Sequence, residues 1–434
     1  MHTNPKTIFY LLEQKGLFAT GDTAPDTRLF SRETRRWVKE IDGDSLKRKY
    51  RIVRNQIFEF LDIRSFAEIN TLLGNGTKRT RIHERANLLL GNMFGIRGTS
   101  GEIASKIKEY SRTADGVIRY LKGKILANYA PYIEMTNEID MLTSPVELLL
   151  IMFDDRYHKK ARFEAKRKLI LMSLAGAIDQ RERETDVENK FAGFLDFLNE
   201  HVWSNDFKIG ELKLVYLLSE HDRENFSCRS VSVVTPAEKE HLKKRPGQKI
   251  TLIKRRSFRI NGKEVPIYVS IRKKPPEAKV LKLLRKGEEN PAVAVDDELG
   301  LMAVLESLPD VNYFQQHLTR CAIKAGSFMT LEDVSDTLNG GQHSSRSAGS
   351  NANTPMFKFF ARMGGMRVEF IVHTHTSYLN YIYQRGTSHD EYEVKRIFES
   401  GVAELLFPED IYQLDLKTIQ NQLIGWFRKN IEEF

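Results

Sequence analysis

The spacing of apolar residues changes along the chain and divides it into two regions. In residues 1–205, apolar side chains recur every three or four positions with few Gly or Pro, as in the segments HERANLLLGNMF and VENKFAGFLDFLNEHVW. This spacing is typical of amphipathic helices. We therefore predict an all-helical region over residues 1–205.

From residue 206 the pattern changes to short segments rich in β-branched residues. The segments ELKLVYLL, SVSVV, KITLIKRRSFRI, EVPIYVSI and RVEFIVHT are typical of strands. Asn261 and Gly262 separate the third segment from the fourth, and an Asn-Gly pair favours a tight hairpin turn. Helical spacing returns at the end of the chain. We therefore predict an α+β protein in which residues 206–434 form a mixed-sheet domain with C-terminal helices.

Length and composition indicate a soluble protein of two or three domains. The chain has 434 residues, of which 41% are hydrophobic and 29% charged, as in ordinary folded proteins. No apolar run reaches the roughly 18 residues needed to cross a bilayer, and the N-terminal residues lack the pattern of a signal peptide. Two cysteines, Cys228 and Cys321, are too few for a disulfide framework or a cysteine-based zinc site. We expect a cytoplasmic protein with no membrane partner.

Basic residues are concentrated in one stretch of the chain. The formal net charge is +9, and from Lys243 to Lys286 there are sixteen Lys and Arg residues against two acids, Glu264 and Glu277. Cations without neighbouring acids repel one another, so we predict that this basic block binds phosphate groups of a nucleotide, RNA or DNA. The alternative is a solvated face of the sheet.

Carboxylates interrupt an apolar segment in PAVAVDDELGLMAVL, where residues 296–298 separate two apolar runs. Runs of this kind are typical of buried elements, so the carboxylates must lie where such an element reaches a surface or a cleft. Further along, Glu369 stands inside the apolar strand MRVEFIVHT, and its neighbours face the other way. One interpretation is a solvated turn closed by Gly300. The other is a divalent-metal site formed by Asp297, at the end of a strand, and Glu369.

The order of these features resembles the RelA/SpoT synthetase family, nucleotidyltransferase-like enzymes that make guanosine alarmones. In that family a strand ending in Arg-x-Lys leads into a helix with a Ser and, four residues later, a Lys, and then into a strand with Asp-x-x-Gly-x-Arg. The matching positions here are Arg272, Lys274, Ala278, Lys282, Asp297, Gly300 and Met302. A later family strand, Glu-x-Gln-x-Arg-Thr, is similar to Glu369, Ile371, His373 and Thr374, and SHDEYEVKR is similar to the His-containing helix that follows it. The resemblance covers roughly residues 265–400.

The resemblance implies a nucleotidyltransferase-like mixed α/β domain. Such a domain transfers a pyrophosphate or nucleotidyl group from a nucleoside triphosphate to a hydroxyl group of a nucleotide or RNA. The transfer depends on a metal ion and on cations that spread the developing charge. Asp297 and Glu369 would be the catalytic residues and would bind Mg²⁺. Arg272, Lys274 and Lys282 would bind the triphosphate.

Several residues on the acceptor side of the family's site are absent. The family's polar side chains are replaced at Ala278, Met302, Ile371 and His373. The family's Tyr-x-Ser-x-His segment, whose ring stacks on guanine, has no counterpart, although Phe357, Phe359 or Phe360 would offer another ring. We therefore predict altered acceptor specificity, or a domain that has lost catalysis and kept a binding surface.

A second motif lies in the helical region. Residues 98–124, GTSGEIASKIKEYSRTADGVIRYLKGK, have a helix N-cap at Thr99 or Ser100 and a polar stretch at 111–113 that would form a turn between two helices. A helix-turn-helix of this kind binds DNA. The cations that would contact the nucleic acid are Arg112, Arg119, Lys122 and Lys124. Packing of a simple helical hairpin is one alternative, and a catalytically inactive nucleic-acid-binding protein that uses this motif and the basic block is the alternative function.

Overall fold

The computed structural model describes residues 8–12, 44–154, 156–204, 213–243, 245–296, 299–341, 354–363 and 365–432. The chain divides into two compact units, each built from three segments. The first unit comprises Met1–Glu184, Pro275–Val295 and Ile397–Ile419, and the second comprises Thr185–Lys274, Asp296–Arg396 and Gln420–Phe434. The units are therefore interleaved along the chain, unlike the two consecutive domains that were expected to meet at residue 205.

The described part of the first unit is helical, as the spacing of its apolar residues predicts. Its helices are α2 (Asp44–Leu61), α3 (Ile69–Leu73), α4 (Gly76–Met93), α5 (Ser100–Tyr120), α6 (Asn137–Asp140), α7 (Pro145–Phe153), α8 (Lys159–Thr185), α11 (Pro276–Lys286), α12 (Ala292–Val295), α16 (Val402–Leu406) and α17 (Glu409–Tyr412). Short 3-10 and π-helical turns connect several of them.

Helix α7 lies in the core of the first unit. Its sequence, PVELLLIMF, is apolar around the whole helix, and each of its residues except Glu147 is buried, as expected for a helix surrounded by others. The helix starts with Ser144 as N-cap, whose side chain accepts a hydrogen bond from the Glu147 amide, and with Pro145 in the first turn. It packs with apolar residues of α2 and α4 in one hydrophobic cluster.

The structure corrects the predicted helix-turn-helix. The segment forms one continuous helix, α5, with Thr99 as its N-cap. Residues 111–113 contain no Gly or Pro that would interrupt a helix. Ser111 is buried and donates a hydrogen bond to the Leu142 carbonyl group. The prediction of a turn is wrong because residues 111–113 continue the helix, with Ser111 on its packed face and Arg112 exposed.

Helix α8 buries several charged side chains, and each of the following has a partner within the first unit. Lys168 lies 2.8 Å from Asp115 of α5. Arg167 donates a hydrogen bond of 2.8 Å to the Tyr412 hydroxyl group of α17. These contacts satisfy charges that would be strongly unfavourable if buried alone. Among the described helices, none is both long enough and apolar enough to cross a membrane.

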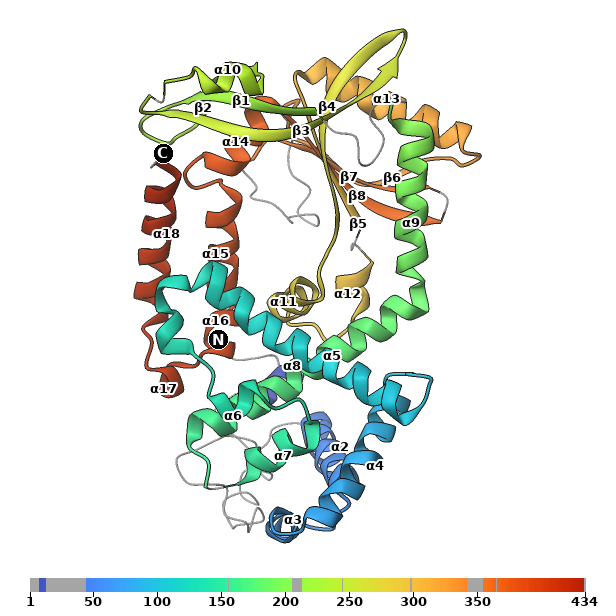
Figure 1. The fold of residues 1–434 in the computed structure, drawn as a ribbon, viewed down its shortest axis with the longest axis vertical. Coiled ribbons are helices and arrows are strands. Elements are labelled where there is room, and N and C mark those ends of the chain that lie inside the picture. Colours follow the sequence, from blue (N-terminus) through green and yellow to red (C-terminus); the bar gives the residue numbers. More distant parts are fainter. Residues whose placement is uncertain are drawn as a thin grey trace. The chain divides into compact units, whose positions relative to one another are not determined.

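The second unit contains an eight-stranded mixed sheet within its described residues (Figure 1). The strand order is β2-β1-β3-β4-β5-β8-β7-β6. The strands are β1 (Lys213–His221), β2 (Cys228–Val234), β3 (Gln248–Ile260), β4 (Lys263–Lys273), β5 (Leu299–Leu305), β6 (Thr330–Asp336), β7 (Phe357–Met363) and β8 (Met366–Thr374). Neighbouring strands are antiparallel except β5 and β8, which are parallel. The prediction of a mixed α/β domain is confirmed.

The predicted hairpin between β3 and β4 is also confirmed. Asn261 and Gly262 have φ angles of 50° and 78°. A two-residue hairpin turn of the type that matches the twist of the strands requires positive φ at both positions, which Asn and Gly tolerate best. Local chemistry therefore sets the register of the two strands.

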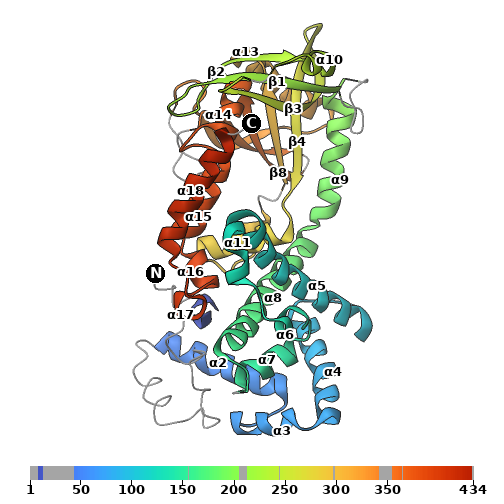
Figure 2. The same ribbon diagram turned by 60° about the vertical axis from the view of Figure 1, so that its left-hand side comes forward.

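Helices pack on both faces of the sheet. The helices that contact the sheet are α9 (Val187–Phe197), α10 (Pro236–Glu240), α13 (Leu308–Lys324) and α14 (His375–Tyr383), and the C-terminal helices are α15 (His389–Glu399) and α18 (Leu416–Glu432). Phe194 of α9, a helix expected in the N-terminal domain, contacts Phe370 of β8. On the opposite face, which we call the α14 face, Tyr378 of α14 contacts Tyr268 of β4. Helix α18 lies beside α15 (Figure 2), and Arg428 donates to Glu391 at 2.7 Å.

Candidate functional site

A row of paired residues crosses four strands on the α14 face. Arg272 of β4 pairs with Gly300 of β5, Gly300 pairs with Glu369 of β8, and Glu369 pairs with Phe360 of β7. Directly paired residues point to the same face of a sheet. Arg272 Nη2 donates a hydrogen bond of 2.8 Å to Glu369 Oε2. The Arg272 side chain therefore crosses over Gly300 to reach the carboxylate.

Gly300 leaves the space that this ion pair needs. A Cβ atom at this position would lie 2.9 Å from Nε and 3.3 Å from Cγ of Arg272. Real Cβ atoms rarely approach so closely, and the Arg272 side chain would have to move. A glycine inside a strand often marks such a close approach. Gly300, which matches the glycine of the family motif, is thus needed in this sheet to make room for the Arg272 side chain.

Glu369 contacts a second cation from the neighbouring strand. The Lys358 Nζ atom of β7 lies 3.0 Å from Glu369 Oε1. The side chains of Glu369 and Lys358 are 6% and 5% exposed, whereas that of Arg272 is 43% exposed. Charges that are removed from water interact strongly because little solvent screens them. Lys358 therefore holds the carboxylate in place, while Arg272 remains accessible to a ligand.

Of the three phenylalanines proposed as a stacking ring, Phe360 lies on the α14 face. Phe357 and Phe359 alternate with it along β7 and point to the other face, where Phe359 stacks on Phe370. The Arg367 guanidinium carbon lies 3.8 Å from the centre of the Phe360 ring. This ring is therefore covered by a cation of its own sheet.

Two aromatic side chains from helices lie near Arg272. Tyr381 of α14 and His389 of α15 stack with ring centres 5.0 Å apart. Burial raises the pKa of Tyr381, an effect that the charge of Arg272 opposes. Burial lowers the pKa of His389, and Arg272 adds to that effect. Both rings are therefore neutral at pH 7 and can stack or form hydrogen bonds beside the cation.

His373 on β8 is also neutral on the α14 face. Burial lowers its pKa to about 4, and its Nδ1 atom lies 3.1 Å from the Ser377 hydroxyl oxygen. The family that this segment resembles has Arg at the matched position. An uncharged imidazole therefore stands where that family has a permanent cation.

The protein is expected to become less stable as the pH is lowered, because His373 is buried in its neutral form. Its pKa is near 6.5 when exposed and about 4 in the fold. As the pH falls, the unfolded chain binds the proton first, so the free energy of unfolding decreases between pH 6.5 and 4. His373→Asn, which keeps a polar group near Ser377, is expected to remove up to about 3 kcal/mol of this decrease. Urea denaturation across this range measures it, and an unchanged pH dependence in the variant would contradict the assignment.

The other residues predicted for this site have different outcomes. Lys274 follows directly after β4 and is half-buried. Lys282 lies on α11, which belongs to the first unit. Asp297 lies outside the described residues, so its pairing with Glu369 stays a prediction. The apolar run before Asp297 forms the one-turn helix α12, and β5 begins only at Leu299. The prediction that Asp297 ends a strand is therefore wrong.

The cations assigned to the helix-turn-helix form no recognition helix, because α5 is continuous. Arg112 is exposed. Arg119 donates a hydrogen bond to a carbonyl group of its own helix. Lys122 lies 3.6 Å from Glu134, and the side chain of Lys124 lies outside the described part of the structure. The prediction of a DNA-binding helix-turn-helix is therefore wrong.

Cations of the basic block form ion pairs with acidic residues that are distant in the sequence. Lys273 forms an ion pair with Glu188, and Lys279 forms one with Glu182. The block, residues 243–286, is also divided between the two units. Its cations were expected to lack partners because few acids lie within the block itself. Ion pairs depend on the fold, and several members of the block are already neutralised.

A metal site is not complete within the described residues. There, no group of three or more His, Cys, Asp or Glu side chains is arranged to hold an ion. Both oxygens of Glu369 contact cations, Arg272 and Lys358. Mg²⁺ commonly uses only one or two carboxylates together with water and substrate phosphates. Magnesium binding by Asp297 and Glu369 therefore stays a prediction.

Lys358 and Tyr381 are not among the residues that the sequence predicts for this site. Lys358 stands in the segment FKFF, where it is the only charged residue among aromatic residues. Like Glu369, it is a charged residue within an apolar strand, and this pattern marks it in the sequence. Tyr381 belongs to no motif, and only the packing of α14 on the sheet brings it close to Arg272.

Comparisons of the chain with protein-family models, with curated proteins and with solved structures found no match.

Proposed function

We propose that the α14 face binds a nucleoside triphosphate and transfers a pyrophosphate or nucleotidyl group from it to a hydroxyl group. The domain would be nucleotidyltransferase-like and similar to RelA/SpoT synthetases. One observation carries the proposal. Arg272, Gly300 and Glu369, each matched to a different family motif, stand in one row across adjacent strands. Three residues with unrelated roles would have no reason to share a row.

Arg272 supplies the cation that a triphosphate can reach. Its planar guanidinium group can form two parallel hydrogen bonds with a phosphate group. When a nucleotide binds, Arg272 exchanges its contact with Glu369 for the phosphate, and Lys358 keeps the carboxylate in position. Phosphoryl transfer needs mainly positioning and charge stabilisation from the protein, and a Mg²⁺ ion at Asp297 would add to that stabilisation.

Glu369 is the group that can accept the proton of the attacking hydroxyl. General bases must lie within hydrogen-bonding reach of that proton. Contact with two cations makes a carboxylate a weaker base, so the departure of Arg272 towards the phosphate also prepares Glu369 for this role. The proposed sequence of events is therefore nucleotide binding first and proton acceptance second.

The acceptor is expected to differ from a free guanine nucleotide. Met302 and Ile371 form the next row on the α14 face, together with Lys358. The family has Arg and Gln where this chain has these apolar residues, which donate no hydrogen bonds. We infer a larger acceptor, such as RNA, that is held partly by other surfaces of the protein. Efficient synthesis of an alarmone from GDP or GTP is not expected.

Incubation of the purified full-length protein with radiolabelled ATP or GTP, Mg²⁺ and candidate acceptors tests the proposal. A label on the γ-phosphate follows pyrophosphate transfer, and a label on the α-phosphate follows nucleotidyl transfer. We expect label in an RNA such as tRNA and little in GDP or GTP. Nucleotide binding without transfer would indicate an inactive binding protein, and failure to bind any triphosphate would contradict the proposal.

Gly300→Ala is expected to reduce the affinity for triphosphate about tenfold, because the new methyl group displaces Arg272 and weakens a charge-assisted hydrogen bond. Isothermal titration with a nucleotide measures the effect. The matched control is Gly193→Ala on α9, where a Cβ atom meets nothing within 4 Å. Equal affinity in the two variants would show that Arg272 does not depend on Gly300.

A further inference from the structure

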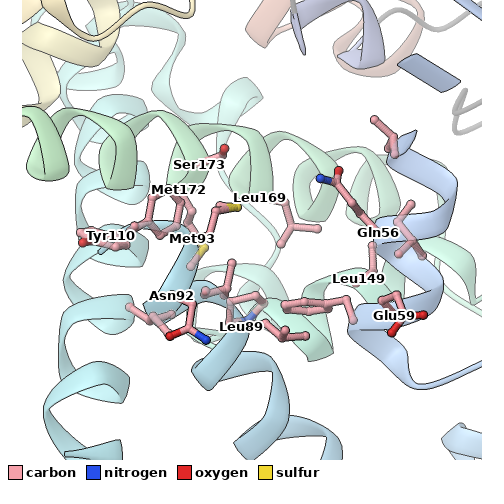
Figure 3. Close-up of a pocket in the computed structure, with 17 residues that line it drawn as sticks. Gln56, Glu59, Leu89, Asn92, Met93, Tyr110, Leu149, Leu169, Met172 and Ser173 are labelled. Atoms are coloured by element: carbon pink, nitrogen blue, oxygen red, sulfur yellow. The ribbon is translucent and has the colours of Figure 1, made fainter. Parts of the chain in front are cut away.

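A pocket with a volume of about 620 Å³ lies within the first unit. Figure 3 shows side chains from several helices around it, and its lining residues come from α2, α4, α5, α7 and α8. Most of the lining is apolar and includes Ile57, Leu89, Met93, Leu149 and Met172. Pockets of this size and character hold drug-sized ligands or several side chains of a partner. The two methionines can adapt to the shape of an occupant.

The pocket offers no free charge to a ligand. Among the described residues that line it, none is Lys or Arg, and its one carboxylate, Glu59, pairs with Arg85 at 2.8 Å. The remaining polar groups include Gln56 and Asn92. A charged group would lose its hydration there without gaining a partner. The part of a ligand that enters the pocket is therefore apolar.

The apolar surface continues outside the pocket along two helices. Ile52 stands one helical turn before Gln56 on α2, and Leu88 stands one turn before Asn92 on α4. Their side chains are 56% and 55% exposed, and that of Met93 is 51% exposed. A small molecule confined to the pocket would leave these side chains in water, whereas an elongated partner would cover them.

The same two helices are strongly basic. Helix α2 carries five Lys and Arg residues against two acids, and α4 carries four against one. Arg48 is exposed one turn before Ile52, and Arg81 is exposed one turn before Arg85. Complementary charge steers association and selects partners. An acidic partner is therefore favoured over a basic one.

The pocket and the apolar surface beside it, with Ile52 of α2 and Leu88 of α4, are called here the α2–α4 groove. We propose that this groove binds an amphipathic helix of a partner protein, and that the polar face of that helix is acidic. Apolar side chains spaced at i, i+4 and i+7 on that helix would enter the pocket and cover Ile52 and Leu88. Its acidic side chains would face the arginines at the ends of both walls. This inference does not depend on the proposed nucleotide chemistry of the second unit.

Selection of a displayed library of randomised helical peptides against the full-length protein tests the inference. The enriched peptides are expected to share apolar residues at the i, i+4 and i+7 spacing and a net negative charge elsewhere. Met93→Lys should weaken binding of a fluorescent enriched peptide at least about tenfold, because it places a cation at the apolar lip. The control, Met141→Lys, changes an exposed methionine of the same unit that does not line the pocket.

Several outcomes would overturn the inference. A basic consensus, or binding that Met93→Lys leaves unchanged, would exclude an acidic helix in this groove. The probe 1-anilinonaphthalene-8-sulfonate, if it binds the pocket while no peptide is enriched, would indicate a small apolar ligand instead. Concentration-dependent dimerisation that Met93→Lys abolishes would indicate a second copy of the chain. Circular dichroism of the variants establishes that each one is folded.

Discussion

Replacing Glu369 by Gln is expected to lower the free energy of unfolding by about 3 to 5 kcal/mol and to abolish group transfer. The carboxylate is almost fully buried and lies 3.0 Å from the equally buried ammonium group of Lys358. A glutamine removes the negative charge and leaves that cation without its anionic partner, which is among the most destabilising of single changes. Transfer stops because an amide cannot accept a proton from the attacking hydroxyl. Chemical denaturation measures the first effect, and the radiolabel assay measures the second.

The double variant Glu369→Gln, Lys358→Met separates these two effects. Removing both charges of a buried pair is often nearly neutral, so much of the lost stability is expected to return. Activity is not expected to return, because the proton acceptor is still missing. A single Glu369→Gln variant within about 1 kcal/mol of the wild type would contradict the strength of the buried pair. Transfer activity in the double variant would contradict the catalytic role of Glu369.

Arg272→Ala is expected to reduce triphosphate affinity about a hundredfold with little change in stability. A bidentate hydrogen bond between a guanidinium and a phosphate group contributes up to about 3 kcal/mol. The Arg272 side chain is partly exposed, and exposed ion pairs contribute little to folding. Isothermal titration with a nucleotide measures affinity, and thermal denaturation measures stability.

The matched control for Arg272→Ala is Arg259→Ala. Arg259 is an exposed residue of β3 that pairs with Glu264, and its loss should leave affinity unchanged. Adding Gly300→Ala to Arg272→Ala should cause no further loss, because both changes remove the same contact. Equal losses for Arg259→Ala and Arg272→Ala would show that only general charge attracts the nucleotide.

Local sequence patterns predict most elements of this fold because their causes are local. The alternation of β4 and the Asn261-Gly262 turn identify strands and a hairpin without reference to the rest of the chain. The secondary structure of two short segments was predicted wrongly. Residues 292–295 are too few to show whether an apolar run is a strand or a helix, and the polar residues 111–113 continue a helix on which Ser111 is buried. In both segments tertiary packing decides the conformation.

Within the candidate site, the sequence predicts only those residues that belong to a recognisable motif. Arg272 and Glu369 stand out by resemblance and because they are charged residues within largely apolar strands. Lys358 reaches Glu369 only through the pairing of β7 with β8, a contact between separate strands that no short segment displays. The interleaving of the two units assigns Lys282 to the helical unit. Glu188, which neutralises Lys273, lies far from the basic block in sequence.

A structure of the protein with Mg²⁺ and a non-hydrolysable ATP analogue would test the central claim most directly. We expect the triphosphate on the α14 face, with a phosphate oxygen within hydrogen-bonding distance of the Arg272 guanidinium group. Lys358 should still contact Glu369, and Arg272 should have left that carboxylate. A nucleotide bound on another surface, with Arg272 still on Glu369, would contradict the account.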